Sequence, residues 1–149
     1  MVNNQSSNQA RITALKILGI ICIMGGLYAI VLEVGNGLIS KGVPVEIFRL
    51  IFASFFIPGG YDLFRLKASG RRTILVLLCW QCVIGILIFL RGVIGNDYSL
   101  TYRFLKFTFQ MDNPVAYYSI AAAFVFIPGI AVAFLSLSQN KIFFEDSHN

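Results

Sequence analysis

The chain has few charged residues: only 13% of its 149 residues are Asp, Glu, Lys or Arg, whereas 57% are hydrophobic. A water-soluble fold of this length would have to bury more apolar surface than one small core can enclose. The scarcity of charge therefore excludes an ordinary soluble domain and indicates a lipid bilayer as the solvent. We read the net charge of +5 as a topology signal, and we expect no nucleic-acid partner.

Residues that commonly perform catalysis or bind metals are also rare. The single histidine, His148, is next to the last residue, and no set of histidines, cysteines and carboxylates has zinc-site spacing. The motifs H-E-x-x-H and G-x-S-x-G and a phosphate-binding glycine loop do not occur. We therefore expect no metal and no cofactor, and the sequence favours a non-enzymatic role over an enzymatic one.

Only three cysteines occur, and two of them, Cys79 and Cys82, form a C-x-x-C sequence. This spacing is used by dithiol redox sites, so a quinone-linked thiol oxidoreductase is one functional alternative. The pair lies within an apolar stretch, which disfavours the reactive thiolate, and a relay normally needs a second accessible pair. The sequence therefore favours structural cysteines.

Long apolar runs are abundant, and four of them approach the roughly 20 residues that a helix needs to cross a bilayer. They comprise residues 12–32, 45–66, 73–94 and 115–138. We predict an all-α integral membrane protein with four transmembrane helices in one domain over residues 1–149. Polar tails are expected at residues 1–9 and 141–149.

The distribution of Lys and Arg predicts how the chain is oriented, because positive charge near a span resists translocation. Seven basic residues fall on the side of both termini and the second connection, and four fall on the other side. The seven are Arg11, Lys16, Arg65, Lys67, Arg71, Arg72 and Lys141; the four are Lys41, Arg91, Arg103 and Lys106. We expect both termini to be cytoplasmic, in a bacterial inner membrane.

An internal repeat relates the two halves of the chain. The four prolines form two pairs 70 residues apart, Pro44 with Pro114 and Pro58 with Pro128. A second set of matches, 60 residues apart, includes Cys22 with Cys82, Gly25 with Gly85 and Asn36 with Asn96. Each repeat unit (about 12–66 and 73–138) contains two spans, so both units should enter the membrane in the same direction. We predict two tandem parallel helical hairpins related by a pseudo-twofold axis.

Prolines and glycines mark the expected shape and contacts of the helices. Pro44 and Pro114 should begin helices, with Asp112 or Asn113 as the cap of the second. Pro58 and Pro128 should kink their helices, which either shapes the packing or opens a pocket between the halves. Small residues at helical spacing let two backbones approach closely. The residues that we expect to serve as kinks or packing positions are Pro58, Pro128, Gly25, Gly26, Gly85 and Gly129.

Four charged residues, Glu33, Glu46, Arg49 and Arg91, should meet at the non-cytoplasmic ends of the first three spans. Charge near hydrocarbon is costly unless it is paired, so we expect Glu46 to pair with Arg49 and Glu33 with Arg91. These pairs either lock the hairpins together or line a pocket for a small polar ligand or ion. The second repeat has Ala116 and Ser119 in place of Glu46 and Arg49, so such a site is asymmetric.

The third connection is longer than the first and rich in aromatic residues. Between Asn96 and Pro114 it reads DYSLTYRFLKFTFQMDN, which suits a short helix in the membrane interface, although the alternation of Leu100, Tyr102 and Phe104 also permits a strand. This segment is interpreted as a membrane-resting loop, a lid over the charged cluster or a docking surface for another subunit.

The sequence favours a membrane protein that acts by contact, as an accessory subunit of a larger complex or as a homo-oligomer. A small carrier or ligand-binding protein that uses Glu33, Glu46, Arg49 and Arg91 is the second hypothesis. The thiol oxidoreductase is the third.

Overall fold

The computed structural model describes residues 2–39, 47–95, 98–104, 107–137, 140 and 142–144. These residues form four α-helices, one β-hairpin and a short 3-10 helix. The helices are α1 (Val2–Ile39), α2 (Ile47–Phe64), α3 (Ala68–Gly95) and α4 (Pro114–Ser136). The strands are β1 (Leu100–Phe104) and β2 (Phe107–Met111), and the 3-10 helix is η1 (Ile142–Phe144).

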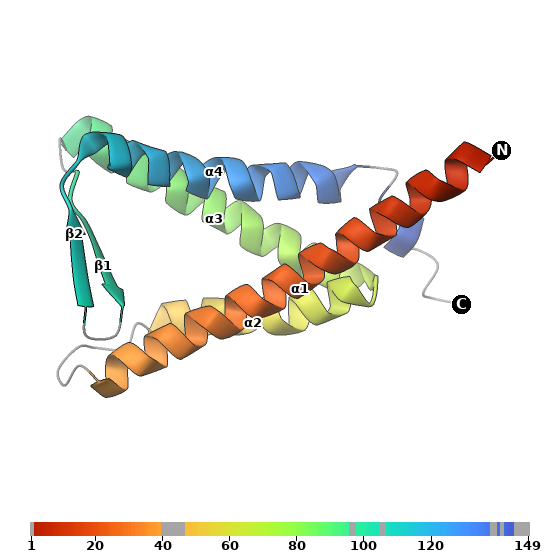
Figure 1. Cartoon of the computed structure of the whole chain (residues 1–149), viewed down its shortest axis with the longest axis horizontal. Coiled ribbons are helices and arrows are strands. Elements are labelled where there is room, and N and C mark those ends of the chain that lie inside the picture. Colours follow the sequence, from red (N-terminus) through yellow and green to blue (C-terminus); the bar gives the residue numbers. More distant parts are fainter. Residues whose placement is uncertain are drawn as a thin grey trace.

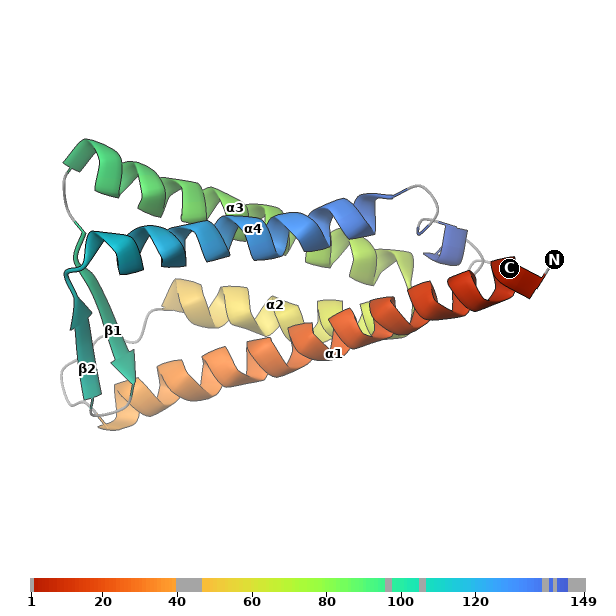
Figure 2. The ribbon, with the colours of Figure 1, turned by 45° about the horizontal axis from the view of Figure 1, so that its top comes forward.

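The helices pack as two pairs. α1 packs against α2, α3 packs against α4, and α2 also contacts α3. Figures 1 and 2 show that α1 and α3 run toward the end that carries the hairpin, whereas α2 and α4 run away from it. The helical structure therefore has two ends. One carries the β-hairpin, and at the other a turn connects α2 to α3.

Three helices are long and apolar enough to cross a membrane. They contain the segments Gln5–Gly35 in α1, Ala68–Gly95 in α3 and Pro114–Ser136 in α4. The predicted α-helices are therefore confirmed, and three of the four expected spans correspond to helices that could cross a membrane. The fourth expected span, residues 45–66, corresponds to the 18-residue helix α2, which is not in this set of candidate spans among the described residues.

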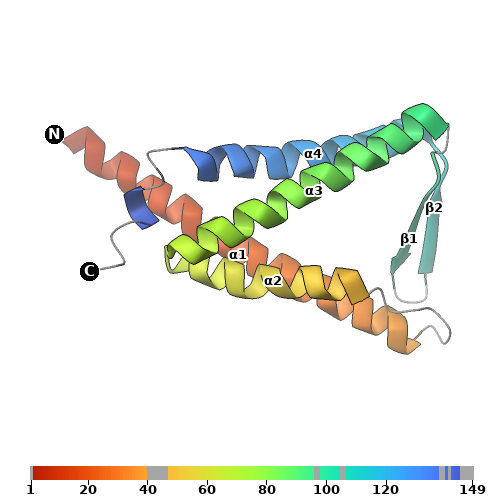
Figure 3. The same cartoon turned by 180° about the vertical axis from the view of Figure 1, so that it is seen from behind.

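The third connection is a β-hairpin and not the interfacial helix that we predicted. β1 and β2 pair antiparallel, with Leu100 opposite Met111, Tyr102 opposite Phe109 and Phe104 opposite Phe107. Aromatic residues alternate along both strands, and cross-strand pairs of such residues favour a sheet over a helix. The hairpin leaves the α3–α4 pair and extends toward the end of α1, which β1 contacts (Figures 1 and 3).

The start of α4 is capped as the sequence predicted. The side-chain oxygen of Asn113 accepts a hydrogen bond from the backbone N–H of Val115 at 2.9 Å, and Pro114 occupies the first turn. This arrangement satisfies one of the free N–H groups at the helix start, and proline is suited to that position. The corresponding Pro44 lies outside the described residues.

A tight turn joins α2 to α3. The N–H of Lys67 donates to the carbonyl of Asp62 at 2.8 Å, and the N–H of Leu66 donates to that of Leu63 at 2.9 Å. This is the Schellman pattern of helix termination, in which one residue takes the left-handed conformation. Here that residue is Leu66, with a φ of 59°, where glycine is the usual choice.

The hydrophobic core lies near this turn, at the end opposite the hairpin. All four helices contribute to it, and η1 adds Phe144. The buried members are Leu15, Cys22, Leu63, Ile74, Leu77, Leu78, Leu135 and Phe144. The expected polar tail 141–149 thus contains one buried core residue, and α1 begins at Val2, within the expected tail 1–9.

Candidate functional site

The charged residues that we predicted to form a cluster lie toward the hairpin end. Glu33 is half-buried near the end of α1, Arg49 is exposed in the first turn of α2, and Arg91 is exposed in the last turns of α3. The end of α1 and the start of α2 belong to one helix pair, whereas α3 ends beside α4, across the hairpin (Figures 1 and 3). Glu46 lies outside the described residues, so its pairing with Arg49 stays a prediction. The pairing of Glu33 with Arg91 also stays a prediction.

Glycine contacts bring α1 and α2 together without intervening side chains. A Cβ placed on Gly19 would lie 2.7 Å from the carbonyl oxygen of Gly60, and one placed on Gly60 would lie 2.7 Å from that of Gly19. One placed on Gly26 would lie 2.8 Å from the carbonyl oxygen of Ala53. Cys22, buried between these glycines along α1, has its Cβ 3.0 Å from the same point on Gly60. The face of α1 that carries Gly19, Cys22 and Gly26 is therefore packed against α2.

Glycines also let α3 and α4 approach closely, but here the glycines of α3 lie against larger residues of α4. A Cβ on Gly85 would lie 2.8 Å from a methyl carbon of Val125, and one on Gly92 would lie 2.6 Å from the ring of Tyr117. The thiol of Cys82 donates to the carbonyl oxygen of Val125 at 3.6 Å. Cys82 is therefore engaged with the backbone of α4, three residues before Pro128.

Two of the predicted packing glycines, the exposed Gly25 of α1 and the half-buried Gly129 of α4, have open space where a side chain would begin. Among the described residues, no atom lies within 4 Å of a Cβ placed on either of them. One turn further along, Ala29 and Ala133 are both exposed. Of the four glycines that the sequence singled out, Gly26 and Gly85 thus pack within the chain, whereas Gly25 and Gly129 belong to open helix faces.

The two predicted kink positions differ in their surroundings. Pro58 lies inside α2 and is exposed, whereas Pro128 lies inside α4 and is buried. Both helices continue beyond their prolines. Pro128 is therefore enclosed by other parts of the chain, whereas Pro58 is not.

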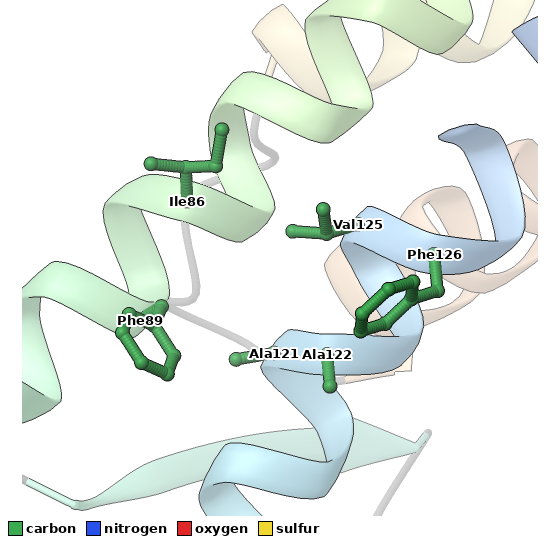
Figure 4. Close-up of a pocket in the computed structure, with 6 residues that line it drawn as sticks. All are labelled: Ile86, Phe89, Ala121, Ala122, Val125 and Phe126. Carbon is green, nitrogen blue, oxygen red and sulfur yellow. The ribbon is translucent and has the colours of Figure 1, made fainter.

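A shallow apolar pocket lies between α3 and α4. It has a volume of about 230 Å³ and is open on one side (Figure 4). Ile86 and Phe89 of α3 face Ala121, Ala122, Val125 and Phe126 of α4 across it. Because every lining side chain is apolar, this pocket differs from the polar ligand pocket that the sequence suggested.

An aromatic cluster joins the hairpin to the α3–α4 pair. The ring of Tyr98, which precedes β1, lies 5.9 Å from that of Tyr117 and 5.7 Å from that of Tyr118. Phe89 contacts Tyr118 at 5.3 Å. The Tyr117 hydroxyl donates to the carbonyl of Ile88 at 2.6 Å. Edge-to-face packing of this kind favours a fixed arrangement of the rings.

Contacts that sequence reasoning missed hold the opposite end together. The Nε of Arg71 donates to the carbonyl of Leu135 at 2.8 Å, near the C-terminus of α4, and its guanidinium lies 5.8 Å from the ring centre of Phe144. Asn140 is fully buried, and its amide donates to the carbonyl of Phe134 at 2.6 Å. The Arg71 contacts join residues far apart in the chain, so no local pattern signals them. The Asn140 contact is local but lies at the end of the long apolar run and in the expected tail region.

The described residues contain no group of three or more His, Cys, Asp or Glu side chains that could hold a metal ion. Cys22, Cys79 and Cys82 are all free thiols; Cys79 is exposed on α3, and Cys82 is half-buried against α4. The fold and these contacts define the class as a helical protein with three membrane-spanning candidates. No protein family, curated protein or solved structure matches the chain.

Proposed function

We propose that the protein is non-enzymatic and acts by packing against other membrane helices, as an accessory subunit of a membrane complex or as a homo-oligomer. The open faces around Gly25 and Gly129 carry this proposal. In hydrocarbon, helices associate mainly through close packing, and small residues permit the closest approach. Inside the chain, Gly19 and Gly60 already act in this way. Gly25 and Gly129 repeat the pattern on faces where no described residue comes within 4 Å of the Cβ position.

The neighbours of the open glycines fit a helix partner. Gly25 and Ala29 are four residues apart on α1, as are Gly129 and Ala133 on α4, so each pair lies on one helix face. Large apolar side chains flank each pair: Ile21 is 60% exposed on α1, and Ile130 is 71% exposed on α4. A small-residue groove with apolar rims suits a second transmembrane helix.

The same proposal includes how the chain is arranged in the membrane. In it, α2 is the fourth span, the chain forms two parallel hairpins, and both termini lie on the cytoplasmic side of a bacterial inner membrane. The positions of Cys22 and Cys82 support the repeat, because each cysteine lies at the packed face of the first helix of its pair. Gly25 and Gly85 depart from it, since only Gly85 packs within the chain.

The experiment measures association of the full chain after gentle extraction in a mild detergent. The wild-type protein is expected to migrate as an oligomer or with other membrane subunits, as determined by mass measurement. Gly25→Leu and Gly129→Leu should reduce this association, because the added side chains begin in open space, with no described atom within 4 Å of the Cβ, and would occupy the grooves that a partner helix needs. Val31→Leu, which places the same leucine side chain at a position that is already occupied by an apolar residue and is 68% exposed, is the control.

A monomeric wild-type protein without partners would contradict the proposal, as would an equal loss of association in Val31→Leu. The polar-ligand hypothesis predicts a different result. In that case Arg49→Ala would abolish a ligand-dependent rise in thermal stability while leaving the mass of the extracted particle unchanged.

A further inference from the structure

The turn between α2 and α3 concentrates positive charge. Arg65, Lys67, Arg71 and Arg72 lie within eight consecutive residues, and three of them, Arg65, Lys67 and Arg72, are exposed. Lys16 of α1 joins them in space, because its ammonium group lies 5.8 Å from the centre of the Phe64 ring, directly before Arg65. We call the exposed set Lys16, Arg65, Lys67 and Arg72 the cationic turn.

Two of these cations rest on aromatic rings. The guanidinium carbon of Arg65 lies 4.8 Å from the centre of the Tyr61 ring, and Lys16 is similarly placed over Phe64. A ring face attracts a cation without neutralising its formal charge. The N–H groups that point away from the ring stay available to an anion. These contacts therefore fix the positions of the two charges and leave their charge unbalanced.

One carboxylate, Asp62, contacts the cationic turn within the described part of the chain. Its Oδ1 lies 3.2 Å from the Lys67 ammonium, and its Oδ2 accepts a hydrogen bond from the Ser69 hydroxyl at 2.8 Å. Asp62 is thus shared between a cation and the first turn of α3. A single carboxylate offsets one of the four exposed positive charges.

The backbone holds this arrangement in place. Leu66 closes the Schellman turn, and a Cβ on Gly70 would collide with the backbone of Asp62 and Leu63. Arg71 points the other way, toward the C-terminus of α4 and Phe144. The exposed cations consequently extend from a rigid, tightly packed end of the helical structure.

The location of the turn specifies the partner. Ala68–Gly95 is long and apolar enough to cross a membrane, so its first residues belong at the level of the lipid headgroups. Aromatic rings with adjacent cations are typical of that level. We propose that the cationic turn binds the phosphate groups of anionic phospholipids. This inference goes beyond helix association and depends only on α3 crossing the membrane.

The test measures lipid binding by the full-length protein in detergent, using native mass spectrometry with added phosphatidylglycerol or phosphatidylcholine. Wild type should bind phosphatidylglycerol preferentially, and the preference should weaken as salt is raised. A basic residue near an anionic surface contributes roughly a fivefold factor in the binding constant. The triple variant Arg65→Gln, Lys67→Gln, Arg72→Gln should therefore lose about 100-fold in affinity for phosphatidylglycerol.

The matched control keeps a positive charge at each position, in Arg65→Lys, Lys67→Arg, Arg72→Lys, and should retain the preference for phosphatidylglycerol. Equal loss in both triple variants, or no loss in either, would overturn the proposal. The single variant Arg72→Gln provides the test if the triple variant does not fold, with an expected loss of about fivefold. Inorganic phosphate at the lipid concentration should not compete; displacement of the lipid by it would assign the turn to free phosphate and overturn the lipid assignment.

Discussion

Gly19 of α1 and Gly60 of α2 lie backbone to backbone where the two helices cross. A Cβ placed on either glycine would lie 2.7 Å from the carbonyl oxygen of the other. Backbone atoms cannot move aside as the end of a flexible side chain can. The spacing of the α1–α2 pair is therefore set at this crossing, and any side chain at either position must push the helices apart.

Gly19→Ala should accordingly destabilise the protein by about 1–3 kcal/mol, the usual cost of overpacking. The measurement is unfolding of the detergent-solubilised protein with increasing SDS. Gly25→Ala is the matched control on the same helix when both variants are measured as dissociated protomers, because no described atom lies within 4 Å of its Cβ. Alanine is the better helix former by about 1 kcal/mol, so Gly25→Ala should be neutral or stabilising. Destabilisation of equal size in both variants would contradict the packing of α1 on α2.

Tyr117 provides a second test, at the α3–α4 pair. Its side chain is 1% exposed, and its hydroxyl donates to the carbonyl of Ile88 at 2.6 Å. Tyr117→Phe removes this hydrogen bond and keeps the ring contacts, so we expect a loss of about 1 kcal/mol in the free energy of unfolding. Tyr28→Phe, at a position 56% exposed on α1, should change it by less than about 0.5 kcal/mol. A neutral Tyr117→Phe would show that the hydroxyl contributes nothing.

Asp62 and Ser69 should be coupled across the α2–α3 turn. Their hydrogen bond of 2.8 Å joins the end of one helix to the start of the next. A double-mutant cycle with Asp62→Asn and Ser69→Ala should give an interaction energy of roughly 0.5–1 kcal/mol, modest because water reaches both side chains. Asp62→Asn combined with Ser54→Ala should be additive, because the Ser54 hydroxyl donates to the carbonyl of Ile51 in its own helix. An additive Asp62–Ser69 cycle would refute the bond.

The helices were predictable because each long apolar run must satisfy its backbone hydrogen bonds internally in lipid. Residues 73–94 and 115–138 therefore anticipated α3 (Ala68–Gly95) and α4 (Pro114–Ser136) within a few residues. The hairpin was missed because its sequence supports both a helix and a strand. Leu105 and Lys106, which separate β1 from β2, are also not the Asn-Gly or Asp-Gly pair that signals a tight hairpin.

The details of helix packing were less accessible to sequence reasoning. Gly25 and Gly26 are adjacent, so they lie about 100° apart around α1. The sequence offered both as packing residues, but only the structure distinguishes Gly26, against Ala53, from the uncovered Gly25. Glu46 lies outside the described residues, and the role of Glu33, Arg49 and Arg91 stays a prediction. Their side-chain types indicate polar contacts without identifying the partners.

Phe144 is a core residue that the sequence did not indicate, because it lies in a segment that we expected to be a polar tail. It is 1% exposed, packs with core residues such as Leu15 and Leu63, and lies beneath the Arg71 guanidinium. Phe144→Ala should cost about 3 kcal/mol, the lower end for a buried phenylalanine. The loss is smaller if the η1 segment detaches first, since detachment limits the cost to the free energy of docking that segment.

These two results are distinguishable by combining the SDS-unfolding measurement with limited proteolysis after residue 140. A stability loss without new cleavage indicates a cavity in a docked segment, whereas new cleavage with a small loss indicates detachment. Ile142→Ala, two residues earlier and 59% exposed, should leave both readouts at wild-type values. If Phe144→Ala behaves like Ile142→Ala, then η1 does not contribute to the core. Arg71 would in that case stabilise the end of α4 through the Leu135 carbonyl alone.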